Sequence, residues 1–123
     1  MAYSKENPSS RQQKVSNLIC AELAKVLRHG KRLDIRLLEN EVTITKVKIS
    51  PDLKIADCYF MPFLKSKLSV DEFLEAFESS KHSLRKQVTE AINLKYSPEL
   101  NFFYDRSVEN AMEVDKVLKS LKQ

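Results

Sequence analysis

The stretch VTITKVKISPDLKIADCYFM, residues 42–61, decides the fold. Apolar residues alternate with polar ones over residues 42–45 and again over residues 47–50, but the second alternation is one residue out of phase. A β-bulge near Thr45 and Lys46 would return all the apolar side chains to one face of a strand. The alternative is a strand that is partly covered on both faces, and we favour the bulge.

The second half of this stretch predicts the partner strand. Residues 50–53, Ser-Pro-Asp-Leu, have the composition of a turn. Residues 54–61 then read as a strand with Ala56, Cys58 and Phe60 on its inner face. The whole stretch is therefore expected to form an antiparallel hairpin.

A helix is expected before the hairpin, over residues 10–29, where apolar residues recur at helical spacing. Ser9 or Ser10 is expected to cap its start, with a glutamine three residues later closing a capping box. Gly30 is the only glycine of the chain and follows two basic residues, which is typical of a helix C-cap.

The chain after the hairpin predicts further helix and one more strand. Ser69 and Glu72 have the spacing of a second capping box. The apolar stripe that follows falters at residues 79–82, so two helices or one long helix fit equally well. Residues 100–105 read as a third strand, and Ser107 is expected to cap a last amphipathic helix.

This order, α-β-β-α-α-β-α, predicts an α+β fold in which helices cover one face of a three-stranded sheet. The 123 residues, 42% of them hydrophobic, suit a single domain, which we place at residues 9–123 after a flexible segment of residues 1–8. No apolar run approaches the ~20 residues of a membrane span. Cys20 and Cys58 stand alone, which favours reduced, buried cysteines over a disulfide or a zinc site.

The chemistry of an enzyme is not expected. The two histidines, His29 and His82, lie at a predicted helix end and at the predicted helix break. One glycine in the chain excludes glycine-rich nucleotide loops. The sequence therefore predicts no catalytic residue, no metal site and no cofactor.

Basic residues are unevenly distributed along the chain. The net charge is +4, and residues 1–54 carry 11 Lys and Arg against 6 Asp and Glu. Such an excess is typical of a protein with a polyanionic partner, and a merely solvated charged surface is the alternative that charge alone leaves open. The side chains expected to contact RNA, chosen by charge and placement, are Arg11, Lys14, Arg28, Lys31, Arg32, Lys46, Lys48, Lys81, Arg85 and Lys86.

Three stretches resemble the ribosome-binding factor A family. They are residues 47–53 around the hairpin turn, residues 84–86 after the helix break, and above all PELNFFYDRS at residues 98–107. The opening helix with Arg11 and Lys14 is similar as well. The resemblance spans about residues 9–120.

The resemblance implies a type II KH-like fold and a function on the ribosome. A member of this family is expected to bind the maturing small (30S) subunit and its 16S rRNA in the cytoplasm. It would assist late rRNA processing and cold adaptation without catalysis, as a monomer off the ribosome, with no membrane contact and no small-molecule substrate. The alternative is a protein-interaction adaptor whose basic surface is incidental.

The family also has an Ala-x-Gly kink between two helices, and here this chain departs from the pattern. The corresponding residues are Ser80, Lys81 and His82. Because histidine adopts a left-handed backbone less readily than glycine, we expect a shallower kink, or a break that Ser80 makes by bonding to the backbone.

Overall fold

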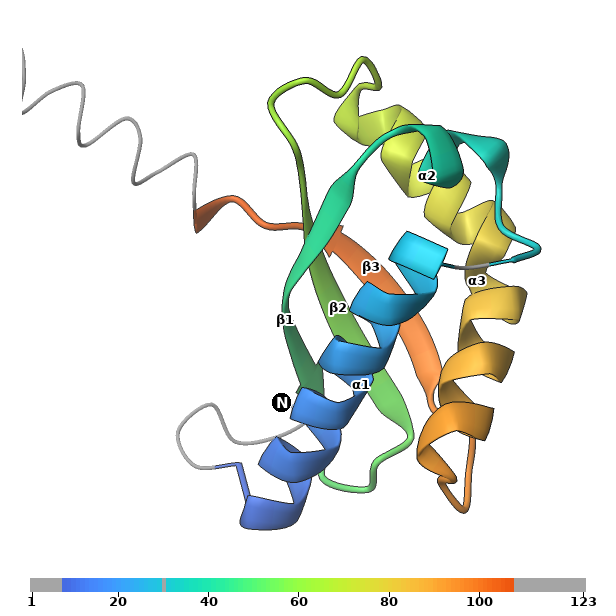
Figure 1. Ribbon diagram of the computed structural model, residues 1–123. Helices are drawn as coiled ribbons and strands as arrows, with labels where there is room; N and C mark the ends of the chain where they lie inside the picture. The colour runs from blue at the N-terminus through green and yellow to red at the C-terminus, as the bar shows by residue number, and fades with distance from the viewer. Residues whose placement is uncertain (1–7, 30, 108–123) are drawn as a thin grey trace, which may run out of the picture.

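Six helices and strands follow one another along residues 8–29 and 31–107, the part of the chain described by this computed structural model (Figure 1). In chain order they are α1 (Ser10–His29), α2 (Ile35–Glu39), β1 (Val42–Ile49), β2 (Ile55–Pro62), α3 (Val70–Ile92) and β3 (Glu99–Tyr104). Three of the predictions concern positions outside the described residues. They are the cap at Gly30, the helix after Ser107 and, except for Pro8, the flexible segment of residues 1–8.

The three strands form one sheet in the order β1-β2-β3, with β1 and β2 antiparallel and β2 and β3 parallel. The hairpin and its bulge are confirmed, because the pairing of β1 with β2 shifts between Ile44 and Lys46. The bulge has the predicted effect. Ile44, Val47 and Ile49 all lie buried on one face, although the sequence spacing between the first two is odd.

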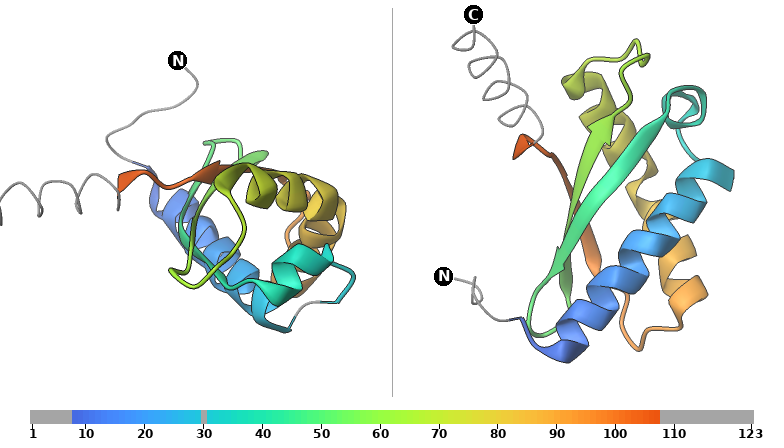
Figure 2. Two further views of the ribbon diagram at one scale, coloured as in Figure 1. Left: turned by 90° about the horizontal axis from the view of Figure 1, so that it is seen from above. Right: turned by 60° about the vertical axis from the view of Figure 1, so that its left-hand side comes forward.

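Helices α1 and α3 cover the same face of this sheet, as Figure 2 shows, and the predicted α+β architecture is confirmed. The arrangement is consistent with a type II KH-like fold. The core between helices and sheet contains side chains from every layer: Ile19 and Leu23 of α1, Cys58 and Phe60 of β2, Phe73, Phe77 and Leu84 of α3, and Leu100 of β3.

Both predicted capping boxes form. The Ser9 hydroxyl accepts a hydrogen bond from the Gln12 backbone N–H at 3.1 Å, and the Ser9 N–H donates to Gln12 Oε1 at 2.9 Å. Ser69 and Glu72 make the same reciprocal pair at the start of α3. Each pair satisfies backbone donors that the first turn of a helix leaves without a partner.

The helical stretch after the hairpin is one helix and not two. α3 continues without interruption through Ser80, Lys81 and His82, although its axis bends near the middle (Figure 1). Among the described residues, a positive φ occurs at Arg32, Leu53 and Asn93 and not at His82. The family's glycine is absent here, and the backbone keeps its helical dihedral angles through His82. The two helices of the predicted order α-β-β-α-α-β-α are therefore corrected to one, α3.

Ser80 has a different role from the predicted one. Its side chain is 2% exposed, and its hydroxyl accepts a hydrogen bond at 2.7 Å from the backbone N–H of Asp34, in the connection between α1 and α2. Asp34 caps the short helix α2, which the sequence analysis did not predict. Ser80 therefore joins α3 to the segment that leads into α2.

We expect Ser80→Ala to lower the free energy of unfolding by about 1–2 kcal/mol, because the Asp34 N–H loses its acceptor in a largely buried position. Urea denaturation followed by circular dichroism would measure the change. His82→Ala, at an exposed position two residues along the same helix, is the control and should change stability by less than about 0.5 kcal/mol. Equal losses in the two variants would contradict the assigned role of Ser80.

Candidate nucleic-acid interface

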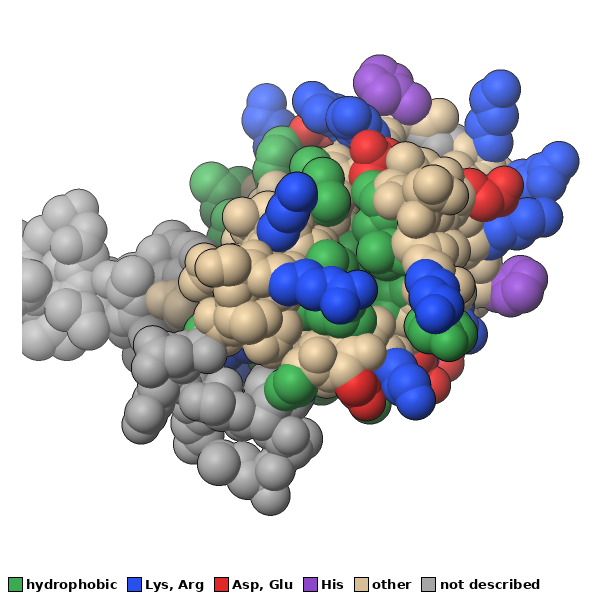
Figure 3. All heavy atoms as spheres, turned by 90° about the horizontal axis from the view of Figure 1, so that it is seen from below, with side chains coloured by type: hydrophobic (Ala, Val, Ile, Leu, Met, Phe, Trp, Pro, Cys, Tyr) green, Lys and Arg blue, Asp and Glu red, His purple; other side chains and the backbone are tan. Residues whose placement is uncertain are grey.

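The ten basic residues predicted to contact RNA do not form one compact patch. Lys81 is half-buried and the other nine are exposed. In the view from below, Lys and Arg side chains are spread over the surface and outnumber acidic ones (Figure 3). Two separate groups can be distinguished by the elements that carry them, and four of the ten residues lie outside both.

The first group, named here the loop group, consists of Arg28, Lys31 and Arg32 at the end of α1 and in the connection that follows. This connection is held against α3 at two points. Gln87 Nε2 donates to the Lys31 carbonyl oxygen at 2.9 Å, and the Asp34 N–H donates to Ser80 Oγ. The loop group therefore sits on a backbone that is fixed to a long helix, which suits recognition of phosphates at fixed spacing.

The second group, named here the sheet group, consists of Lys46, Lys48 and Lys81. The first two project from β1 on the face of the sheet that carries no helix, since the alternate residues Val47 and Ile49 are buried on the other face. Lys81 reaches the same face from α3, where its Nζ lies 3.5 Å from Asn101 Oδ1 on β3. The structure thus brings together residues that are 33 to 35 positions apart in the chain.

The remaining predicted residues lie apart from these groups. Arg11 and Lys14 are exposed on the first turns of α1, and Arg11 is about 25 Å along the helix axis from Arg28. Arg85 donates a hydrogen bond to the Ser97 carbonyl oxygen at 2.7 Å, so its guanidinium is partly engaged by the connection between α3 and β3. Lys86 is exposed on the same helix.

Arg36 also belongs to the basic stretch after α1, but its charge is neutralised within the protein. Its guanidinium lies 3.0 Å from carboxylate oxygens of both Asp34 and Glu75. The hydrogen bonds from Arg36 lower the pKa of Asp34 to about 2, and the two carboxylates raise the pKa of Arg36. Arg36 therefore stabilises the α2 region and is a poor candidate for a phosphate contact.

Two aromatic side chains lie beside the sheet group. Tyr59 on β2 and Phe103 on β3 are register partners on the helix-free face, with ring centroids 5.5 Å apart. From the sequence alone, Tyr59 and Tyr104 would be the aromatics of these two strands expected to be exposed. Tyr104 instead packs toward the core, with its ring 6.1 Å from that of Phe60, and Phe103 takes the outward position.

Two side chains of types that can act in catalysis, Cys58 and Asp105, are engaged within the fold. Burial raises the pKa of the Cys58 thiol to about 12, so this thiol stays protonated at neutral pH. Hydrogen bonds from Ser107 and Thr45 lower the pKa of Asp105 to about 2, which leaves this carboxylate ionised and fully engaged. Within residues 8–29 and 31–107, no group of three His, Cys, Asp or Glu side chains is arranged to hold a metal ion.

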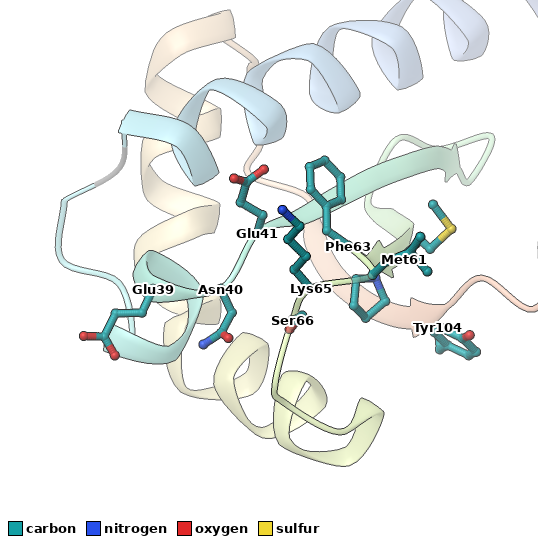
Figure 4. A pocket seen from close by; sticks show the side chains of 10 residues that line it. Glu39, Asn40, Glu41, Met61, Phe63, Lys65, Ser66 and Tyr104 are labelled. Carbon is teal, nitrogen blue, oxygen red and sulfur yellow. The ribbon is translucent and has the colours of Figure 1, made fainter.

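A pocket of about 730 Å³ lies where β2 and β3 end (Figure 4). Its lining includes the apolar side chains of Met61, Phe63 and Leu64, the ring of Tyr104, and the charged side chains of Glu41 and Lys65. Phe63 is 46% exposed and the neighbouring Leu64 is 95% exposed. Side chains of this kind suit contact with an apolar partner better than contact with phosphates. Across the described helices, none has the length and apolar character that crossing a bilayer requires.

Comparison with known proteins gives consistent matches over nearly the whole chain. The sequence profile of the family described as Ribosome-binding factor A matches residues 11–118. The Ribosome-binding factor A of Rickettsia africae (strain ESF-5) is 47% identical over 113 residues, which cover 92% of this chain and 93% of that protein. That of Rickettsia prowazekii (strain Madrid E) is 46% identical over 112 residues, 91% of this chain and 87% of that protein.

Solved structures resemble the fold as well. The crystal structure of ribosome-binding factor A from Thermus thermophilus has a TM-score of 0.60 at 18% identity, with 78% of this chain and 98% of that chain covered. A homology model of the Thermus thermophilus factor, fitted into the cryo-EM map of a 30S complex with that factor, has a TM-score of 0.57 at 18% identity. It covers 74% of this chain and 91% of that chain.

Proposed function

Because this chain belongs to the ribosome-binding factor A family, we propose that it binds the maturing small (30S) ribosomal subunit through its 16S rRNA. It assists late rRNA processing and adaptation to cold, and it acts in the cytoplasm by holding the RNA and not by catalysis. It works as a single KH-like domain, residues 9–123, and is a monomer off the ribosome.

The observation that carries this proposal is the family match, which extends over residues 11–118 with relatives at 47% identity. The Thermus thermophilus factor supports the choice of partner, because it has been placed in a 30S complex and shares the fold. No cofactor, metal or small-molecule substrate is needed for binding of this kind.

The contacts are made by basic side chains on rigid elements. The loop group and the sheet group are placed for phosphates, with further contacts from Arg11 and Lys14 on α1 and from Arg85 and Lys86 on α3. Residues on helices and strands keep the spacing of their backbone atoms when the protein is free, so little backbone entropy is lost on binding. The spread of the groups over several faces suits a partner that surrounds the protein.

Salt dependence tests the RNA contact. We expect the chain to co-sediment with maturing small subunits, with an affinity that falls steeply as potassium chloride rises. If four to six phosphates are neutralised, log affinity should fall against log salt with a slope of about 3 to 5. Crosslinking to precursor subunits would map the RNA sites. Recovery on fully mature 70S ribosomes alone, or on no ribosomal particle, would contradict the assembly function.

One observation favours a second candidate, a protein-interaction adaptor. The pocket beside Phe63 and Leu64 has an apolar lining, and these side chains are more exposed than their size would lead one to expect. An adaptor that binds through this surface would show a nearly flat salt dependence, because few counterions are released when apolar surface is buried. The same titration therefore separates the two functions.

A further inference from the structure

We propose that the helix-free face of the sheet binds single-stranded RNA, with a nucleobase stacked on the Tyr59–Phe103 pair and the lysines of the sheet group placed for the adjoining phosphates. The inference rests on the RNA partner of the proposed function and adds to it a binding mode, base stacking, and a defined site.

The register of the sheet places these side chains in rows. Lys46 pairs with Tyr59 across β1 and β2, and Tyr59 pairs with Phe103 across β2 and β3. The next row on the same face holds Lys48, Asp57 and Asn101. The Lys46 ammonium group therefore lies on the β1 side of the aromatic pair. Successive rows follow along the strands at the regular spacing of a sheet.

The aromatic pair offers a surface that a base can cover. The two ring centroids are 5.5 Å apart and the ring planes are tilted by 31°, so the rings pack against each other as an offset pair, named here the platform. Phe103 is 43% exposed, whereas Phe60 on the opposite face of the same sheet is fully buried. Exposed aromatic rings on a sheet are the surface on which RNA-binding domains stack unpaired bases, since every base has a π-face.

The charges around the platform favour RNA over an apolar partner. Lys46 Nζ lies 4.7 Å from the centroid of the Tyr59 ring, and Lys48 Nζ lies 5.8 Å from it. Lys81 Nζ is on the β3 side, 3.5 Å from Asn101 Oδ1 and 3.8 Å from a carboxylate oxygen of Glu78. Lysines on both sides of an aromatic pair match the alternation of base and phosphate along a single strand.

Three carboxylates also face this side of the sheet: Asp57, Asp105 and the exposed Glu99. The first two accept hydrogen bonds within the protein. Asp57 Oδ1 accepts from Asn101 Nδ2 at 3.4 Å. Asp105 is 6% exposed and accepts from Ser107 and Thr45. Of the lysines in the sheet group, Lys46 and Lys48 are therefore better placed than Lys81 to turn an ammonium group toward a phosphate.

A cross-strand aromatic pair also stabilises a sheet, so the experiment has to separate stacking on RNA from folding. The chain contains no tryptophan, which allows a single reporter to be placed. Tyr59→Trp and Phe103→Trp keep an aromatic ring at the platform. We expect the fluorescence of each variant to be quenched when eight-residue oligouridylate or oligoadenylate is added, and to change little with an RNA duplex of the same length.

Tyr96→Trp is the matched control. Tyr96 is 63% exposed, and Lys95 Nζ lies 5.4 Å from its ring centroid. It therefore has a neighbouring cation as Tyr59 does, but within residues 8–29 and 31–107 no second ring is paired with it. Its fluorescence should not respond to the oligonucleotides. Equal quenching at Tyr96→Trp, or none at Tyr59→Trp and Phe103→Trp, would overturn the proposal.

The second experiment measures the affinity of each variant for labelled oligonucleotides. We expect Tyr59→Leu/Phe103→Leu to weaken binding about fivefold or more with an unchanged salt slope, because stacking and not charge is lost. Lys46→Gln/Lys48→Gln should instead reduce the slope by about 1.4, at 0.7 per phosphate of a single strand. Tyr59→Phe/Phe103→Tyr keeps both rings and should bind like the wild type, and urea denaturation would establish that each variant is folded.

The proposal and the proposed function can fail separately. Suppose that folded Tyr59→Leu/Phe103→Leu binds the oligonucleotides as tightly as the wild type and co-sediments normally with small subunits. The stacking proposal would then be contradicted, and the proposed ribosomal function would not. A wild-type chain that fails to bind small subunits would contradict the ribosomal function, while the tryptophan titration would still decide whether the platform binds single-stranded RNA.

Discussion

Phe77→Ala is expected to lower the free energy of unfolding by about 3–5 kcal/mol, the range for removing a fully buried aromatic side chain. Phe77 on α3 has no exposed surface and joins the helix to two strands. Its ring is stacked on that of Phe102 with centroids 4.4 Å apart, and lies 4.8 Å from that of Phe60. Since a domain of this size has a total stability of about 5–15 kcal/mol, the variant should be close to unfolding at 37 °C.

Urea denaturation followed by circular dichroism would measure this loss, with the m-value as a check on two-state behaviour. Phe103→Ala is the matched control, because it makes the same chemical change on the helix-free face, where the ring is 43% exposed. We expect it to cost about 1 kcal/mol. A loss at Phe77→Ala no larger than at the control would show that the core does not depend on the contact of α3 with the sheet.

The elements that could be predicted from the sequence are those with a local signal. The bulge follows from two alternations that are out of phase, since only an extra residue near Thr45 returns the apolar side chains to one face. The capping boxes follow from residue types three positions apart. In each case the residues that form the structure are near neighbours in the chain.

The rest of the fold depends on contacts between distant segments. Helix α2 has five residues, too few for a periodic pattern, and its cap residue Asp34 is held by Ser80, 46 positions away. The continuity of α3 was equally ambiguous, because polar residues at 79–82 fit both a break and a helix that packs through its serine. The buried Ser80 resolves the ambiguity only when its partner on the other segment is known.

The candidate site was predictable in its composition but not in its layout. The predicted basic residues lie on the surface, yet their division into a loop group and a sheet group follows from the packing of α3 beside β3. The outward aromatic of β3 was missed because Phe102, Phe103 and Tyr104 are consecutive. Three aromatics in a row carry no alternation of polarity, so the sequence does not indicate which one faces solvent.

The loop group is the place where loss of charge should weaken subunit binding most, because its three side chains lie on one short, fixed segment. We expect Arg28→Gln/Lys31→Gln/Arg32→Gln to reduce the salt slope by about 2 to 3, at 0.7 to 0.9 per phosphate contact. If the electrostatic part of binding vanishes near 1 M salt, the same slopes correspond to a loss of roughly a hundredfold in affinity at 0.15 M. Stability should change little, since these side chains are exposed.

Co-sedimentation with maturing small subunits over a range of potassium chloride concentrations would measure both quantities. The matched control is Lys54→Gln/Lys65→Gln/Lys67→Gln, which removes the same charge from exposed positions outside the predicted contacts. Long-range attraction falls with net charge in both triple variants, so both should associate more slowly at low salt. Only the loop-group variant should lose slope, because counterions are released only where a side chain meets a phosphate. Equal slopes in the two variants would mean that the loop group contributes net charge and no contact.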